Sequence, residues 1–581
     1  MKKNTKSVSM ADAIWKILDE CLHLVFKRNE LGDVIFPFIT LRRMDSLLAD
    51  VNERVRATNE QMKDKIDAEK LDLLLRKVAG GRRFYNTSRF TLESLLEDAP
   101  NIEVNFRTYI NGYNQEVVDI LNKYQFQNIV AKLTRNKLLF KLIDQICSNT
   151  FDIASLTDME MGDCFEEIIR LANEGNGETA GEHFTPRDAI YLMSAVLFRP
   201  HADQLSRKGI IRSIYDPTCG TGGMVNIGRK FIREDLCSSP EEAPSIYTYG
   251  QELNETAYAI AKSEALMTGA DTSDIRLGDT LSEDQFPTEH FDYMMANPPY
   301  GINWTKEKEF VQSESLNPFG RFSAGLPAIS DGQLLFLQHM ISKMSPNGSR
   351  IGVVTNGSPL FSGAAGSGES NIRKWIIESD WLETIIALPK DMFYNTSIST
   401  YIWILDNKKT PERKGKVQLI NATQLCKSLT KSLGNKRNTI EDTYEQIYEV
   451  YAAFKESDIC RIYDNEDLGY LVLTVEQPLR DEKGNPILKK GQLQPDKSKR
   501  TTERVALTRD AKEYFHTEVL PHIDPQSWLD IQSTKIGYEI NFTRYFYEYK
   551  APEKSEVIKE RLTNKETLQE IQNLFNAIFE D

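Results

Sequence analysis

Apolar positions follow two different periods along this chain. From about residue 9 to residue 170 they recur at helical spacing, as at Ile14, Leu18 and Leu22, which predicts a helical region. From about residue 175 to residue 425, short apolar runs alternate with helical stretches, which is typical of a doubly wound α/β sheet. A chain of 581 residues is too long for one hydrophobic core, so more than one domain is expected.

The part after residue 425 has a different character. It is mixed and charged, and it contains Asp481-Glu-Lys-Gly-Asn-Pro486, a sequence typical of a hairpin turn. From Glu556 the apolar positions gather on one broad side of a predicted amphipathic helix. We expect this region to be mainly helical. The predicted domains are a helical domain at 1–170, an α/β domain at 171–425 and a C-terminal region at 426–581.

A glycine-rich turn follows the first strand predicted in the α/β region. The apolar run Ile210–Tyr215 predicts the strand, and Met224–Arg233 predicts the helix after the turn. Glycine in the turn lets the backbone approach a ligand closely. The Gly-Lys-Ser/Thr ending of a P-loop occurs nowhere in the chain, so nucleoside-triphosphate chemistry is not expected, whereas a dinucleotide site remains open. The turn residues predicted to hold a cofactor are Asp216, Thr218, Gly220, Thr221, Gly222 and Gly223.

Acidic residues follow the next two strand candidates. Ile246–Gly250 leads into Glu252, whose carboxylate suits two ribose hydroxyls, as in NAD and S-adenosylmethionine sites. Asp274–Leu277 leads into Gly278 and Asp279. Cys219, inside the glycine-rich turn, has no base near it in sequence and is interpreted as small-residue filler.

The sequence Asn297-Pro-Pro-Tyr300 follows another strand candidate, Phe291–Ala296. Alone, such a tetrapeptide is usually a turn. It also has the groups needed to activate an exocyclic amino nitrogen, whose lone pair is delocalised into the ring. The side-chain oxygen of Asn297 and the backbone carbonyl of Pro298 can accept hydrogen bonds from both N–H groups, which stabilises the transition state. Pro298 and Pro299 stiffen the loop, and Tyr300 offers a flat face on which an extruded base can stack.

The order and spacing of these segments resemble the class I methyltransferases that act on an amino nitrogen, above all N6 of adenine in DNA. Glu182-His-Phe-Thr-Pro-Arg187 resembles the segment that in these enzymes folds over the methionine end of the cofactor. Phe36–Met44 matches the N-terminal helical domain of type I restriction–modification methylase subunits, and Lys535–Tyr547 is similar to them again. The chain is therefore identified as a member of that family of modification subunits.

This resemblance implies a Rossmann-like methyltransferase domain, S-adenosylmethionine as cofactor, and Asn297, Pro298, Pro299 and Tyr300 as the catalytic residues. Asp279 is implied at the cofactor's adenine amino group. Phe393 is a candidate second stacking face for the flipped adenine, with an ordinary core position as the alternative. Besides the turn residues, the cofactor-binding residues that we expect are Glu182, His183, Phe184, Thr185, Pro186, Arg187, Glu252 and Asp279.

The formal net charge of −14 bears on the partners, because proteins bind DNA largely by neutralising phosphates. For a chain this acidic, we expect another protein to provide much of the affinity for double-stranded DNA and to recognise the target sequence. The resemblance implies two copies of this chain with one specificity subunit, and a further motor and nuclease subunit for restriction. It also favours docking of the helix from Glu556 on a partner, with packing on its own domain as the alternative.

The cysteines, the histidines and the hydropathy of the chain indicate which kinds of protein it does not resemble. The seven cysteines show no pairing pattern, and the seven histidines are scattered without a ligand spacing, so no disulfide framework and no metal site are predicted. No long apolar run and no apolar signal core after Met1 are present, so we expect no membrane segment and a cytoplasmic location.

Two rival functions remain open from the residues alone. Asn-Pro-Pro-Tyr also serves methylation of a glutamine side-chain amide in proteins, although the chain length and the helical flanks favour DNA. A non-catalytic assembly scaffold is the other rival, against which the intact motifs count.

Overall fold

The computed structural model describes residues 5–27, 30–148, 153–174, 185–239, 242–269, 274–394, 396–433 and 435–547, with residues 555, 559, 569 and 573 beyond them. The chain divides into two units, Met1–Ile540 and Asn541–Asp581. In the second unit the described residues include helix α20, Phe542–Tyr545. The helix predicted from Glu556 onward lies outside the described residues. Among the described residues no helix is long and apolar enough to cross a membrane.

The first part of the chain is helical, as its apolar spacing predicts. Helix α2 is the centre of this part, because nearly all of its side chains are buried, including Phe36 and Phe38 on either side of Pro37. Arg43 is also buried and donates to the carbonyl of Ile153 over 2.8 Å. The helices are α1 (Thr5–Leu22), α2 (Leu31–Leu48), α3 (Asn52–Met62), α4 (Ala68–Val78), α5 (Ile102–Asn111), α6 (Gln115–Lys123), α7 (Phe126–Arg135), α8 (Leu139–Cys147) and α9 (Asp158–Glu174).

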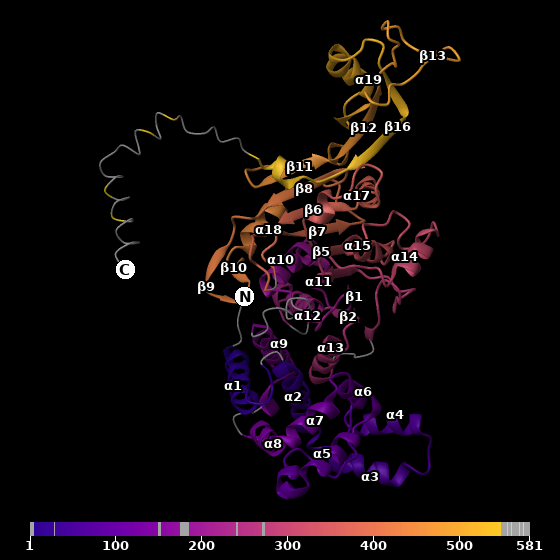
Figure 1. Cartoon of the computed structure of the whole chain (residues 1–581). Helices are drawn as coiled ribbons and strands as arrows, with labels where there is room; N and C mark the ends of the chain where they lie inside the picture. Colours follow the sequence, from indigo (N-terminus) through magenta and orange to yellow (C-terminus); the bar gives the residue numbers. More distant parts are fainter. Residues whose placement is uncertain are drawn as a thin grey trace. The chain divides into compact units, whose positions relative to one another are not determined.

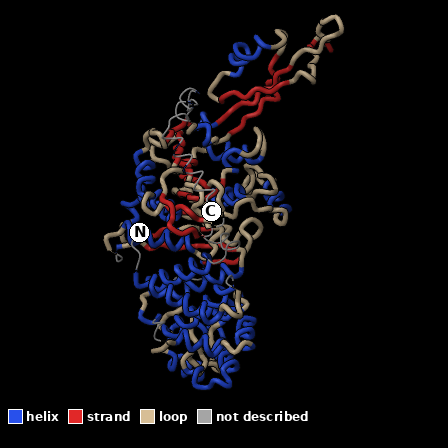
Figure 2. Tube along the Cα trace, turned by 60° about the vertical axis from the view of Figure 1, so that its left-hand side comes forward, coloured by secondary structure: helices blue, strands red, loops and turns tan. Residues whose placement is uncertain are grey.

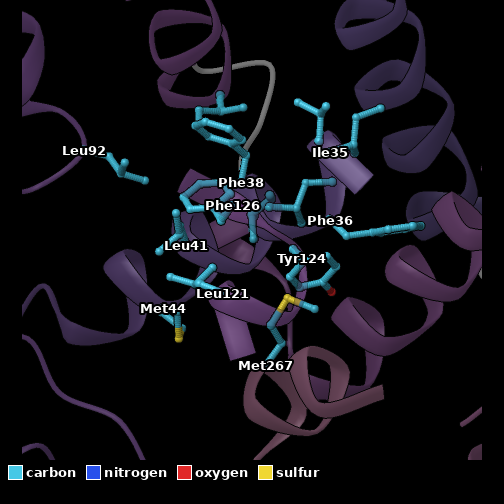
Figure 3. Packing of buried hydrophobic residues seen from close by; sticks show 14 of the residues in the cluster. Ile35, Phe36, Phe38, Leu41, Met44, Leu92, Leu121, Tyr124, Phe126 and Met267 are labelled. Atoms are coloured by element: carbon cyan, nitrogen blue, oxygen red, sulfur yellow. The ribbon is translucent and has the colours of Figure 1, made fainter. Parts of the chain in front are cut away.

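The helical core extends into the α/β part (Figure 3). The Phe38 ring stacks on Phe106 with centroids 5.7 Å apart and meets Phe126 edge-on at 5.2 Å. Met267, from helix α13 (Glu255–Thr268), is buried in the same cluster. Helix α13 therefore packs against the helical part as well as beside strands β2 and β3. The domain boundary near residue 170 stays a prediction.

A nine-stranded mixed sheet forms the centre of the α/β part, in the order β11-β8-β6-β7-β5-β4-β1-β2-β3. β1, β2, β3, β4 and β5 run parallel, whereas β7 is antiparallel to β5 and β6, and β11 is antiparallel to β8. The predicted doubly wound sheet is confirmed, with antiparallel strands added on one side. Its strands are β1 (Ile211–Asp216), β2 (Ser245–Glu252), β3 (Ile275–Leu277), β4 (Tyr293–Ala296), β5 (Arg350–Asn356), β6 (Leu382–Ala387), β7 (Thr400–Asp406), β8 (Lys416–Asn421) and β11 (Cys460–Asp464).

Helices cover both faces of this sheet (Figures 1 and 2). On one face Phe198 of α10 packs against Tyr293 of β4 with ring centroids 5.0 Å apart. On the other face Tyr215 of β1 shares a hydrogen bond of 3.0 Å with His339 of α15. The helices are α10 (Arg187–Phe198), α11 (Ala202–Leu205), α12 (Gly223–Phe231), α14 (Lys308–Ser315), α15 (Gln333–Ser342), α16 (Ser358–Phe361), α17 (Gly368–Glu378) and α18 (Tyr444–Ala453).

The expectation of a mainly helical C-terminal region is wrong for the residues described after 425, among which strand residues outnumber helical residues. The segment Gly469–Glu476 is rich in β-branched and aromatic side chains, which favour a strand. The predicted hairpin turn is confirmed, because the N–H of Asp481 donates to the carbonyl of Asn485 over 2.9 Å. The further elements here are β9 (Lys427–Leu433), β10 (Lys436–Thr439), β12 (Gly469–Glu476), β13 (Leu488–Lys489), β14 (Gln492–Leu493), β15 (Thr501–Ala506), β16 (Trp528–Tyr538) and α19 (Ala511–Tyr514).

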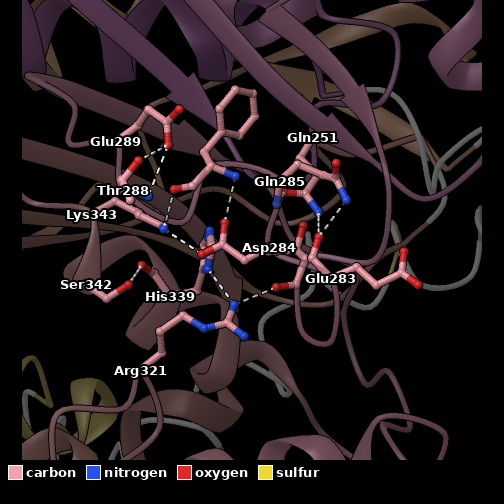
Figure 4. A network of polar contacts seen from close by, with 12 residues as sticks. Gln251, Glu283, Asp284, Gln285, Thr288, Glu289, Arg321, His339, Ser342 and Lys343 are labelled. Carbon is pink, nitrogen blue, oxygen red and sulfur yellow. Dashed lines mark hydrogen bonds and ion pairs between the residues drawn. The ribbon is translucent and has the colours of Figure 1, made fainter.

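An excursion of about thirty residues after Tyr300 is held by a polar network against the loop after β3 and against helix α15 (Figure 4). It is irregular apart from α14, and Arg321 is its anchor. The Arg321 guanidinium donates to the carbonyls of Thr280 and Leu281 over 2.7 and 2.9 Å and contacts His339 Nδ1 at 2.9 Å. Burial, reinforced by Arg321, lowers the pKa of His339 to about 3. A neutral His339 can therefore accept from Arg321 on one ring nitrogen while the other faces Tyr215.

Candidate active site

The glycine-rich turn joins β1 to α12 and is held from two sides. Gly222 has φ +85°, a left-handed conformation that glycine adopts without strain. The N–H of Thr218 donates to Asp216 Oδ1 over 2.8 Å. The N–H of Gly220 donates to Glu252 Oε2, at the end of the neighbouring strand β2, over 2.8 Å. The turn is therefore fixed to the ends of two adjacent parallel strands.

Asp216 is buried, with 1% of its surface exposed. Burial, together with the nearby Glu252 carboxylate, raises its pKa to about 8. Its Oδ1 accepts from Thr218, whereas no described residue donates to Oδ2. A buried carboxyl with an open oxygen is poised to receive a positively charged ligand, because a cation would stabilise its ionised form.

At the ends of β2 and β3, Glu252 and Asp279 have all their carboxylate oxygens engaged. Glu252 Oε1 accepts from the N–H of Asn254 over 2.7 Å, and Oε2 accepts from Gly220. Asp279 Oδ1 accepts from the N–H of Leu281, and Oδ2 accepts from the hydroxyl of Ser282, each over 2.9 Å. Each oxygen keeps a second lone pair for a ligand hydroxyl or amino group.

Asn297 follows β4, which pairs directly with β1. Its amide Nδ2 donates to Thr185 Oγ1 over 3.0 Å, and its Oδ1 accepts from the hydroxyl of Tyr300 over 2.7 Å. The amide is therefore held from both sides, with one lone pair of Oδ1 left for another donor. Pro298 is buried behind it, while Pro299 and Tyr300 are half-buried.

A narrow cavity of about 20 Å³ joins these predicted segments. It brings together residues from the stretch before α10, from the glycine-rich turn and from the end of β4. Gly220 and Gly222 shape the turn without lining the cavity, and Glu252 and Asp279 are not among its lining residues. Its lining comprises Glu166, Thr185, Ile190, Asp216, Thr218, Cys219, Thr221, Gly223, Met224, Ile227 and Asn297.

Glu166 is a lining residue that the sequence analysis missed. It lies on α9, where acidic residues on an amphipathic helix are typical of a solvated face, so no signal distinguished it. In the structure it accepts from Nε of Arg187, and Nη1 of Arg187 lies 3.3 Å from Glu167 Oε2. The cavity thus has an arginine–carboxylate pair at its rim, contributed in part by the helical region.

The remaining predicted residues fall into two groups. Thr185, Pro186 and Arg187 are described, and α10 begins at Arg187. Glu182, His183 and Phe184 lie outside the described residues, so their placement over the cofactor stays a prediction.

Phe393 lies directly behind Tyr300. The two rings meet edge-on with centroids 6.4 Å apart and an interplanar angle of 73°. Only 2% of the Phe393 surface is exposed, so in this structure it supports the Tyr300 ring from the core. Its role in stacking a base stays a prediction.

Cys219 is buried in the lining of the cavity, and its Sγ contacts the carbonyl of Gly220 at 3.8 Å. Burial raises the pKa of the Cys219 thiol, the opposite of what a nucleophilic cysteine needs. Within the described part of the chain, no cluster of three or more His, Cys, Asp or Glu side chains could hold a metal ion.

Two protein-family models match this chain, one over the helical part and one over the α/β part. The model of the N-6 DNA Methylase family matches residues 157–472, and that of the HsdM N-terminal domain matches residues 10–146. The MjaIX methylase subunit of a type I restriction enzyme from Methanocaldococcus jannaschii is 30% identical over 299 residues, 51% of this chain and 49% of that protein. The HindI methylase subunit from Haemophilus influenzae is 29% identical over 51% of this chain and 61% of that protein.

The aligned parts therefore span roughly half of the first of these relatives and somewhat more of the second. Among solved structures, a type I restriction-modification methyltransferase subunit from Streptococcus thermophilus superimposes with a TM-score of 0.63 at 21% identity, over 80% of this chain and 97% of that one. This likeness confirms the predicted fold class. The family model covers more than half of the sequence, and the chain belongs to the N-6 DNA methylase family.

Proposed function

We propose that this chain transfers a methyl group from S-adenosylmethionine to N6 of an adenine in DNA, as the modification subunit of a type I restriction–modification complex. The observation that carries the proposal is the position of Asn297, which lines the same cavity as Asp216 and the glycine-rich turn. The acceptor for the amino group and the pocket for the methyl donor thus share one edge of the sheet.

Asn297 and Pro298 would bind the adenine amino group. The free lone pair of Asn297 Oδ1 and the carbonyl of Pro298 accept its two N–H bonds, which draws the nitrogen toward tetrahedral geometry and frees its lone pair. The hydrogen bonds of Asn297 to Thr185 and Tyr300 fix the amide beforehand, so little reorganisation accompanies the reaction. Tyr300 stacks on the extruded base, since its ring is fixed from behind by Phe393.

The charges that line the cavity fit the methionine end of S-adenosylmethionine. Asp216 and Glu166 present carboxylates to a ligand whose methionine end carries an ammonium and a sulfonium, and Arg187 can bind the ligand's carboxylate. Glu252 and Asp279 accept from the ribose hydroxyls and from the adenine amino group. When bound, the sulfonium supplies an activated methyl group that leaves a neutral thioether, so neither a metal nor a covalent enzyme intermediate is required.

The partners follow from the family and the charge. The relatives are named as methylase subunits of type I restriction enzymes, which implies partner subunits for this chain too. With a net charge of −14, the chain leaves target recognition to a specificity subunit, two copies of this chain binding one such subunit. A motor and nuclease subunit completes the restriction complex, which acts on double-stranded DNA in the cytoplasm.

Methyl transfer from labelled S-adenosylmethionine tests the substrate class. The chain, with and without the protein of its neighbouring gene, is incubated with unmethylated duplex DNA and, separately, with cell protein. We expect the label in N6-methyladenine after digestion of the DNA, and only with the partner present. Label in glutamine of protein would support the rival amide methyltransferase. Binding of both donor and DNA without any transfer would support a scaffold.

A further inference from the structure

The segment between β12 and β15 concentrates positive charge in an acidic chain. Between these strands, residues 477–500 hold seven Lys or Arg side chains and three Asp or Glu side chains, whereas the whole chain has a net charge of −14. The match to the N-6 DNA methylase family ends at residue 472, before this segment begins. The family likeness therefore assigns it no role.

Backbone hydrogen bonds fold this segment into stacked hairpins. The N–H of Leu479 donates to the carbonyl of Gln494 over 2.7 Å, and the N–H of Ile487 donates to the carbonyl of Leu479 over 2.8 Å. The N–H of Asp496 donates to the carbonyl of Gln477 over 2.8 Å. Strands β13 and β14 pair within the fold. The segment is therefore a fixed surface, so its charges need not be ordered when a ligand binds.

Four lysines lie in the turns of these hairpins or directly beside them, and we call them the turn lysines: Lys483, Lys490 and Lys497 in turns, and Lys489 at the end of β13. All are exposed. Within the described residues none of them forms an ion pair, whereas the two arginines that follow are paired, Arg500 with Glu476 and Arg504 with Glu539. Two acidic residues of the turns accept from nearby backbone N–H groups, Asp481 from Asn485 over 2.8 Å and Asp496 from Ser498 over 3.0 Å. The turn lysines thus present to solvent ammonium groups that have no ion-pair partner among the described residues.

The three-stranded sheet β15-β12-β16 carries these turns at one end and is anchored to the α/β part at its other end (Figure 1). β12 pairs with β16 from Gly469 opposite Tyr538 to Glu476 opposite Trp528. At the first of these pairs the buried guanidinium of Arg373 donates to the carbonyl of Tyr538 over 2.6 Å. The basic segment leaves the sheet at the second pair, a strand's length from this anchor.

We propose that the turn lysines bind the phosphodiester backbone of duplex DNA, outside the base that is methylated. The proposal rests on DNA being the substrate. Four unpaired ammonium groups on a preformed surface suit phosphates, which lie at regular intervals and need no particular base sequence. A protein partner would need an apolar patch at the centre of its interface, whereas the exposed apolar side chains here are only Leu479, Ile487 and Leu488, and two lysines follow Leu488 directly.

The salt dependence of DNA binding tests this assignment. The full chain is titrated with a fluorescent duplex from about 50 to 200 mM salt, as the unaltered protein and with the turn lysines all changed to Gln. Each lost phosphate contact lowers the slope of log K against log salt by about 0.9, so we expect the slope to fall by about 3 to 4. The corresponding Lys→Arg variant should keep the original slope.

A matched control separates this effect from overall charge. The lysines Lys65, Lys208, Lys414 and Lys455 are equally exposed, and changing all four to Gln removes the same charge elsewhere. The control should keep nearly the whole slope, and thermal melting should show that both variants are folded. An unchanged slope in the turn variant, or an equal fall in the control, would overturn the proposal.

The outcome also separates this proposal from the proposed function. If the turn variant loses only its association with the partner subunit, the surface is a protein interface and the DNA assignment is wrong. If the unaltered chain shows no DNA binding, the assignment fails too, and the labelled-donor experiment decides whether methylation of DNA fails with it.

Discussion

At the end of β1 the carboxyl of Asp216 is buried and one of its oxygens accepts no hydrogen bond from any described residue, whereas at the end of β2 both oxygens of Glu252 accept backbone N–H bonds. These two carboxylates belong to the two ends of the proposed cofactor pocket. The first end lacks compensation for negative charge and therefore favours a cation. The second is already stabilised and offers only spare lone pairs, which suit neutral hydroxyl groups.

The contrast matches the chemistry of the proposed cofactor. Its methionine end carries the ammonium and the sulfonium, and its nucleoside end is neutral. 5′-Methylthioadenosine shares the nucleoside end and lacks both charges, so it reports on one end of the pocket alone. Comparing the two ligands shows which end a substitution affects.

The largest effect is expected from Asp216→Asn, which keeps the shape of the side chain and removes its charge. At pH 8 the affinity for S-adenosylmethionine should fall about 10- to 100-fold, since a hydrogen bond to a charged group contributes about 1.5–3 kcal/mol. The affinity for 5′-methylthioadenosine should stay close to that of the unaltered chain. Calorimetric titration with both ligands measures these affinities. An equal loss of affinity for the two ligands would contradict the distinction between the two ends of the cofactor pocket.

A smaller and equally selective loss is expected from Glu166→Gln. The variant replaces the carboxylate that lines the cavity with a neutral amide of the same size. The affinity for S-adenosylmethionine should fall about tenfold, as for the loss of one charge-assisted hydrogen bond. Glu167→Gln is the matched control, because Glu167 also lies near Arg187 without lining the cavity. If the control lost as much affinity, Glu166 would act only by positioning Arg187.

The pH dependence of binding tests the same contrast without a substitution. The pKa of Asp216 is raised to about 8, so below that pH the carboxyl holds a proton that a cationic ligand must displace. The affinity for S-adenosylmethionine should therefore rise between about pH 6 and 7.5, by at most about tenfold per unit, before an α-amino group with a pKa of about 7.7–8.0 begins to lose its own proton. A pH-independent affinity in the unaltered chain, or the same slope in Asp216→Asn, would contradict this.

The parts of the fold and site that the sequence predicted are those with a local signature. Apolar runs bounded by Gly and Asn placed β1 and β4, and parallel pairing then brought Asp216 and Asn297 to one cavity. The helical spacing of the first part gave its helices, because one apolar stripe per helix is needed to bury a core.

Other features depend on contacts that no local pattern records. Glu166 reaches the cavity only because α9 packs beside α13, and Phe393 supports Tyr300 from nearly a hundred residues away. The strands after residue 460 were mistaken for part of a helical region, because the amphipathic pattern beyond Glu556 outweighed the β-branched run at Gly469–Glu476. The role of Asn297 as an acceptor stays a prediction, and its hydrogen bonds to Thr185 and Tyr300 could be found only in the structure.

The most direct test of the central claim is single-turnover methyl transfer to adenine by Asn297→Ala, with the cofactor saturating and the partner subunit present. Removing one preorganised acceptor should slow transfer by about 10²–10³-fold, while the affinity for S-adenosylmethionine stays unchanged because the methionine-end carboxylates remain. Transfer to N6 of adenine at the rate of the unaltered chain would contradict the assignment of this site.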